Sequence, residues 1–90
     1  MATLYNADGS TVKVSPANGR AFTLAELQAL VGGFIELVPG TAQRPALCNE
    51  EGRLARLPFN DEASRRFGMD LVGNVVECDT RIESGDDGEA

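Results

Sequence analysis

Three carboxylates are the residues of this chain that could do chemistry. Glu50 and Glu51 are adjacent, and Asp70 follows further along the chain. Oxygen ligands of this kind suit a hard cation such as Mg²⁺, and paired carboxylates can act as general acid and base. Neighbouring side chains on an exposed turn splay apart, however, which leaves their geometry loose. We therefore expect no enzyme and no catalytic, cofactor-binding or metal-binding residue. A metal-dependent enzyme built on Glu50, Glu51 and Asp70 remains an alternative.

Histidine is absent from the chain, and the two cysteines, Cys48 and Cys78, are far apart. These facts argue against the usual zinc sites and against Ser-His and Cys-His nucleophile pairs. In a reducing cytosol, cysteines within apolar segments are expected to remain thiols. The sequence has neither an apolar run of about 20 residues, as a membrane helix needs, nor a start typical of a signal peptide. We predict a cytoplasmic protein without a cofactor and without a membrane partner.

The net charge of −6 is unevenly distributed. Residues 77–90 carry six acids and one base, whereas residues 1–76 carry eight acids and seven bases. A protein that binds nucleic acid directly needs a basic surface to neutralise phosphates, and no basic stripe is visible, so we expect no direct nucleic-acid binding. An acidic mimic or decoy of nucleic acid remains an alternative function.

The stretch ALVGGFIELVPG places Gly32 and Gly33 between a helix-like and a strand-like segment. Thr23 and Glu26 have the spacing of a capping box, and helical apolar spacing follows, which predicts a helix over residues 24–31. A phosphate-binding glycine loop precedes a helix, because the free N–H groups are at its N-terminus. This pair follows the helix. We therefore interpret it as a corner, with one glycine at positive φ, that leads into the strand FIELV.

The N-terminal segment predicts a β-hairpin over residues 2–14, because strand-forming residues flank the turn signal Asp8–Gly9. Its core candidates are Leu4, Val12 and Val14.

Two further strands and a helix are expected after the glycine corner. Residues 46–48 and 53–57 have strand composition, and the turn between them places Gly52 where positive φ is favoured. Asn60 is expected to cap a short second helix over residues 61–67, with acids in its first turn and arginines in its last.

The last predicted strand covers residues 70–78 and is interrupted by Gly73. Together the elements predict an α+β fold: a small, twisted, largely antiparallel sheet of about five strands, packed on one main helix and a short second helix. We expect a single domain over residues 1–83 and a disordered acidic tail over residues 84–90.

Four ordered motifs, LVGGFIELV, CNEEG, LPFN and LVGNVV, resemble a family of small domains of unknown function, DUF3846, found mainly in phages, prophages and bacterial plasmids. The resemblance covers residues 22–78 and implies a mobile-element setting in the bacterial cytosol, or in an infected host cell. It implies no activity. The positions that match the family pattern are Leu30, Val31, Gly32, Gly33, Ile35, Glu36, Asn49, Glu50, Glu51, Gly52, Leu57, Pro58, Asn60, Val72, Gly73 and Asn74.

Six polar residues are candidates for ligand or partner binding: Asn49, Glu50, Asn60, Arg65, Arg66 and Asn74. Each also has a structural interpretation as part of a turn, a bulge, a helix cap or a solvated helix end. The leading hypothesis is a non-enzymatic accessory protein of a phage, prophage or plasmid that binds a host protein or a small cytosolic ligand. Because a site in so small a domain forms most easily between subunits, we also predict a homo-oligomer.

Overall fold

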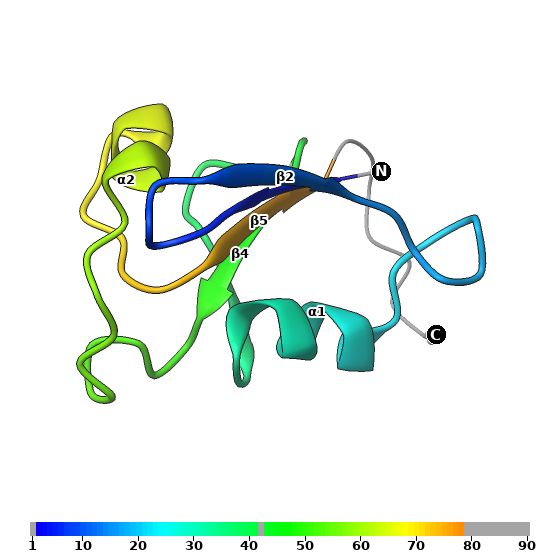
Figure 1. Cartoon of the computed structure of the whole chain (residues 1–90), viewed down its shortest axis with the longest axis horizontal. Coiled ribbons are helices and arrows are strands. Elements are labelled where there is room, and N and C mark those ends of the chain that lie inside the picture. Colours follow the sequence, from blue (N-terminus) through cyan, green and yellow to red (C-terminus); the bar gives the residue numbers. More distant parts are fainter. Residues whose placement is uncertain (1, 42, 79–90) are drawn as a thin grey trace.

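The computed structural model describes residues 2–41 and 43–78. Its elements are β1 (Ala2–Tyr5), β2 (Thr11–Val14), α1 (Leu24–Val31), β3 (Ile35–Leu37), β4 (Ala46–Asn49), α2 (Asp61–Phe67) and β5 (Val75–Cys78). The strands form one antiparallel sheet in the order β2-β1-β5-β4-β3. Figure 1 shows α1 along one face of the sheet and α2 on the other side, near one end. The predicted α+β fold is confirmed.

Helix α1 has the boundaries that its local sequence predicts. The Thr23 hydroxyl accepts a hydrogen bond from the Glu26 backbone N–H at 3.1 Å, and the Glu26 carboxylate accepts one from the Thr23 N–H at 2.8 Å. This reciprocal pair confirms the capping box. Gly32 ends the helix in the left-handed conformation, with φ 82°, and donates its N–H to the Gln28 carbonyl. The glycine pair is therefore the corner that we predicted.

The face of the sheet under α1 holds the first apolar core. Alternate residues of each strand point to it, so that Leu4 and Leu47 both lie opposite Val76 in the neighbouring strand β5. The buried residues of this cluster are Ala2, Phe22, Leu27, Val31, Leu47, Val76 and Cys78. Phe22, immediately before the helix cap, thus anchors the entry to α1 as a hydrophobic staple does.

The opposite face carries a second apolar cluster beneath α2. Its buried members are Val38, Ala46, Ala63, Leu71 and Val75. The rings of Tyr5 and Phe67 meet edge to face beside it, with centroids 5.9 Å apart. Asn60 caps α2 as predicted, and Gly68 ends it at φ 71°. Leu71, Val75 and Val76 enter the core as expected.

The predicted strand over residues 53–57 is wrong. This segment forms successive turns, in which the Ala55 N–H donates to the Glu51 carbonyl at 2.9 Å and the Leu57 N–H to the Gly52 carbonyl at 3.0 Å. The apolar composition was misleading because Leu54 faces solvent, with 84 % of its surface exposed. Gly52 is not among the glycines at positive φ. A Cβ there would lie 2.9 Å from the Val72 side chain, so close packing explains this glycine.

The predicted hairpin forms, since β1 pairs with β2, but its turn is wider than two residues. Asn6 N–H donates to the Ser10 carbonyl across the loop, and Gly9 adopts φ 99°. Leu4 and Val14 pack against the core, whereas Val12 is 47 % exposed because β2 is an edge strand. The prediction of Val12 as a core residue is therefore wrong.

Cys48 and Cys78 are not joined to each other by a disulfide bond; Cys78 is buried and Cys48 is partly exposed. None of the helices in residues 2–41 and 43–78 has the length and apolar character to span a bilayer. The predicted acidic tail, residues 84–90, and the domain boundary before it lie outside the described residues.

Candidate functional site

A groove of about 280 Å³ lies beside β3 and β4. Its floor includes Glu36 and Cys48, which are paired across these two strands and point away from α1. Its walls are the segments of residues 49–54 and 69–72. The Arg53 guanidinium donates a hydrogen bond to the Asp70 carbonyl at 2.9 Å, so the two walls are tied to each other.

Large apolar side chains surround this groove. Leu54 and Met69 line it and are 84 % and 37 % exposed, and Leu37, 46 % exposed, borders it in β3 with its side chain on the α1 side of the sheet. Phe34, 63 % exposed, lines an adjoining hollow of about 310 Å³ together with Gly33 and Ala55. We call Phe34, Leu37, Leu54 and Met69 the β3-edge patch. Apolar side chains gathered around a concavity in this way mark an interaction surface more often than scattered ones do.

The groove is negatively charged, because Glu36, Glu50 and Asp70 line it together with one base, Arg53. Burial raises the pKa of the Cys48 thiol and the charge of Glu36 raises it further, while Arg53 acts in the opposite direction. Cys48 is therefore a protonated thiol at neutral pH, and a thiol is a poor nucleophile compared with a thiolate. The negative charge and the exposed apolar side chains of the groove are complementary to basic and apolar groups.

The outer edge of β3 presents backbone groups that β4 does not use. Val38 N–H donates to the Ala46 carbonyl and Glu50 N–H to the Phe34 carbonyl, each at 2.8 Å, on either side of the Glu36–Cys48 pair. Backbone groups alternate in direction along an antiparallel strand. Since Phe34, Glu36 and Val38 therefore face β4, the N–H and C=O groups of Ile35 and Leu37 point outward from the sheet.

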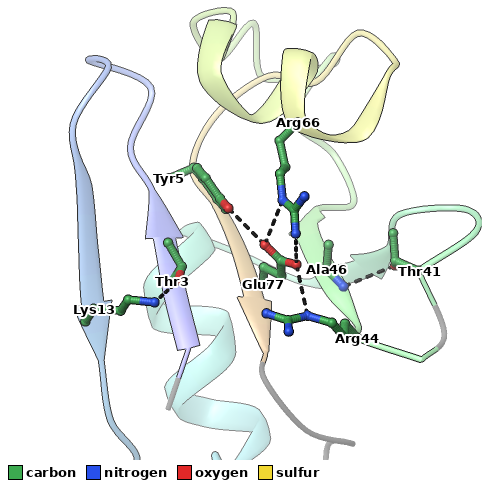
Figure 2. Close-up of polar contacts among 8 residues, drawn as sticks. All are labelled: Thr3, Tyr5, Lys13, Thr41, Arg44, Ala46, Arg66 and Glu77. Carbon is green, nitrogen blue, oxygen red and sulfur yellow. Dashed lines mark hydrogen bonds and ion pairs between the residues drawn. The ribbon is translucent and has the colours of Figure 1, made fainter.

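A second polar cluster surrounds Glu77 in β5, on the face that α2 partly covers (Figure 2). The Tyr5 hydroxyl donates to Glu77 Oε1 at 2.9 Å. Arg66 from α2 donates to both carboxylate oxygens, at 3.3 and 2.8 Å, and Arg44 Nε lies 3.4 Å from Oε2. The Glu77 side chain is only 5 % exposed, while both arginines are about half exposed. A hollow of about 250 Å³ borders this cluster.

The cluster keeps Glu77 ionised within the fold. Burial by itself would raise the pKa of Glu77, but the hydrogen bonds from Arg66 and Tyr5 and the charges of Arg66 and Arg44 outweigh burial and lower it. Burial and the bond to Glu77 raise the pKa of Tyr5. The carboxylate thereby connects the sheet to α2 through Arg66 and to the segment before β4 through Arg44.

A family described as "Domain of unknown function (DUF3846)" matches residues 3–89, almost the whole chain. The chain belongs to the DUF3846 family. This match confirms the resemblance that the four sequence motifs carry. No curated protein and no solved structure matches the chain.

The asparagines of the DUF3846 motifs all hydrogen-bond to backbone groups. Asn60 is fully buried; its amide donates to the carbonyls of Tyr5 and Gly73 at 2.9 and 2.8 Å, and its oxygen accepts from the Ala63 N–H at 3.0 Å. It therefore joins β1, α2 and the entry to β5. The position of Asn60 before a helix predicted the helix cap. It did not predict the two long-range hydrogen bonds.

Asn49 and Asn74 make similar bridges. Asn49 donates to the Val31 carbonyl at 3.2 Å and accepts from the Glu51 N–H at 2.8 Å. Asn74 accepts from the Ala7 N–H at 3.0 Å and donates to the Leu30 carbonyl at 3.4 Å. Both amides thus connect the C-terminal end of α1 to other segments. These bonds give the motif asparagines a structural role, whatever else they contact.

The six candidate residues do not form one cluster. Asn49 and Glu50 line the groove beside β3, and Arg66 borders the hollow next to Glu77. Arg65 is exposed and pairs with Glu62 at 3.3 Å, one helical turn away. Glu50 and Asp70 line the groove, but no group of three acids or cysteines within the described residues is placed to hold a metal ion.

Sequence reasoning missed Tyr5, Arg44, Cys48 and Glu77 as site residues. Glu77 was counted with the acidic C-terminal segment, yet it stands in the apolar stretch VVEC and belongs to a buried strand. A charge within such a strand needs a partner, and that signal was available. The sequence could not identify the partners, because Tyr5 and Arg44 are distant in the chain and come close to Glu77 only when the sheet forms.

Proposed function

We propose that this DUF3846 domain is a non-enzymatic accessory protein of a phage, prophage or plasmid, and that it acts in the cytoplasm by binding a host protein. The observation that carries the proposal is the β3-edge patch, in which exposed apolar side chains surround a groove at the edge of the sheet. Protein interfaces concentrate their binding energy in such apolar centres with a polar rim.

Two features favour a protein over a small molecule as the occupant. The groove volume of about 280 Å³ lies just below the usual range for ligand pockets, about 300–1,000 Å³. Leu54 at its margin and Phe34 in the hollow next to it have most of their surface in solvent, and a small molecule inside the groove would leave both uncovered. A protein surface laid across the groove covers both.

The test compares capture of bacterial proteins by the wild-type chain and by two matched variants, read by native mass spectrometry and by hydrogen exchange of the complex. Leu54→Glu places a charge in the β3-edge patch. Leu24→Glu places the same charge on another exposed leucine, at the start of α1, away from the groove. Surface changes of this kind alter stability by about 0.5 kcal/mol or less.

We expect one host protein to be retained by the wild-type chain and by Leu24→Glu, to be lost with Leu54→Glu, and to slow exchange around the groove. A partner that both variants retain equally, or that protects a different surface, would refute the site. A retained small molecule in place of a protein would show that the occupant is a ligand.

A further inference from the structure

We infer that the partner contributes an extended segment that adds as a sixth strand to β3, with a basic residue opposite Glu36 and apolar residues on either side of it. This inference rests on the proposed function and specifies the chemistry of the partner at the same site. It is carried by the direction of the backbone groups of β3, the charge at Glu36 and the apolar side chains beside it.

The backbone requirement for strand addition is met at β3. Ile35 and Leu37 direct their N–H and C=O groups outward, away from the ladder with β4. An edge strand with such groups is a template for pairing, and proteins that avoid pairing place charges or prolines there or cover the edge. In the described part of the chain β3 is the last strand of the sheet on this side.

The charge of Glu36 decides what kind of strand can pair. An incoming antiparallel strand that bonds to Ile35 and Leu37 places its middle residue directly opposite Glu36, in a pair that is not hydrogen-bonded, with a Cα separation of about 4.5 Å. A second copy of this chain, paired symmetrically through β3, would put Glu36 opposite Glu36. Like charges at this position destabilise a sheet. A lysine or arginine in the partner is attracted instead, and the remaining charges of the groove, Glu50 and Asp70 against Arg53, reinforce the preference.

The residues on either side of this basic residue meet an apolar surface. Ile35 and Leu37 point to the face of the sheet that carries α1, where Ile35 packs against the core and Leu37 is 46 % exposed. Partner residues opposite them point to the same face and cover Leu37. Alternation therefore specifies the pattern apolar–basic–apolar, with the basic side chain directed to the groove and the apolar side chains directed to the side of α1.

The test uses two synthetic nine-residue peptides with blocked ends that share a Val/Ile/Thr framework. One carries lysine at the alternate positions, and the other carries glutamate there. Each is added at about 1 mM, where complexes with a Kd near 1 mM form, and amide exchange in the ¹⁵N-labelled protein is followed by NMR. We expect the lysine peptide to slow exchange of the Ile35 and Leu37 amides about twofold at a Kd of about 1 mM, and more at a lower Kd, because both become ladder donors, and the glutamate peptide to have little effect.

Three controls test the geometry of strand addition. In Glu36→Lys the preference should reverse, so that the glutamate peptide protects these amides. In Leu37→Pro the β3–β4 ladder is kept, because this N–H points outward, and edge strands tolerate proline at such positions; binding should be lost. A lysine peptide N-methylated on the amides that face β3 removes the same bonds without changing the protein, and should not bind.

Peptide-induced chemical-shift changes at Leu54 and Met69, without slower amide exchange at Ile35 and Leu37, would overturn strand addition and leave the groove as a binding site. Equal protection by both peptides, or binding by neither, would overturn the inferred partner chemistry. The capture experiment with Leu54→Glu is independent of all these outcomes, so a failure of the proposed function is recognised separately.

Discussion

Single asparagine side chains connect much of this domain. Asn60 is the strongest case, because it is fully buried and its amide satisfies two carbonyls and one N–H from three separate segments. An unsatisfied buried carbonyl costs more than a hydrogen bond to it contributes. The DUF3846 motif LPFN therefore has a role in stability that needs no ligand to explain it.

Asn60→Ala should lower the free energy of unfolding by about 2–4 kcal/mol, since it removes the helix cap and leaves the Tyr5 and Gly73 carbonyls without their donor. Urea denaturation measures this loss. Asn60→Ser is the matched control, because its hydroxyl retains the cap but replaces neither donor, and its loss should be intermediate. An alanine variant as stable as the wild type would contradict the bridging role.

Glu77→Gln should change the dependence of stability on pH. The pKa of Glu77 is lowered by folding, so its charge stabilises the protein above the unfolded value of about 4.3, and this contribution is lost as pH falls through the folded pKa. The difference in unfolding free energy between the wild type and Glu77→Gln should be constant near neutral pH and shrink below about pH 4.3.

Denaturation at pH 7 and at intervals down to pH 3 measures this difference. Tyr5→Phe removes one hydrogen bond but leaves the arginines on the carboxylate, and so should retain most of the acid dependence. If the difference between the wild type and Glu77→Gln were the same at every pH, the lowered pKa would be wrong.

At the scale of elements, the corner between α1 and β3 depends on two glycines for two different reasons. Gly32 adopts φ 82° and has open space around it, so a side chain there is strained by the backbone alone. Gly33 does not have positive φ, but a Cβ on it would lie 2.8 Å from Asn49 Nδ2. Asn49 is held in that place by its bond to the Val31 carbonyl. The corner thus combines a helix end with a close contact to β4.

We expect Gly32→Ala to cost about 1 kcal/mol or more of unfolding free energy through backbone strain, and Gly33→Ala to be destabilising through the contact with Asn49. A double-mutant cycle separates the two. Asn49→Ala should reduce the cost of Gly33→Ala and leave that of Gly32→Ala unchanged. Equal costs of Gly33→Ala in both backgrounds would show that the contact does not matter.

At the scale of the whole molecule, the two faces of the sheet are unequally covered. The short helix α2, with about two turns, lies near one end of its face, whereas α1 runs along the other (Figure 1). Seven large apolar residues remain exposed among the described residues: Val12, Leu24, Phe34, Leu37, Leu54, Phe59 and Met69. Four of them form the β3-edge patch, on which the proposed contact with another chain rests.

The predicted homo-oligomer follows from the same surface and is tested by light scattering across a concentration series. We expect the mass to rise above the 9.5 kDa of one chain as concentration increases. Symmetric self-association through β3 would place Glu36 opposite Glu36, which is unfavourable, so we expect the assembly to use another part of the surface. Glu36→Lys should therefore not abolish assembly. A mass of 9.5 kDa at every concentration would contradict the prediction.

The sequence by itself determined the features that depend on neighbours three or four residues apart. Thr23 and Glu26 set the start of α1, Gly32 its end, and Asn60 the start of α2, because each signal acts within one turn of backbone. The family motifs and the α+β class were also readable. Residues 53–57 were misread because their composition suits a strand and a run of turns equally, and burial distinguishes the two.

Tertiary structure alone decided which segments meet. The strand order β2-β1-β5-β4-β3 puts Tyr5 beside Glu77 and leaves β3 at an edge, and no local signal specifies either. The same holds for the asparagine bridges, whose acceptors lie far away in the chain. Pairing between distant strands is selected by the total burial and hydrogen bonding of the whole sheet, and these quantities do not exist until the chain is folded.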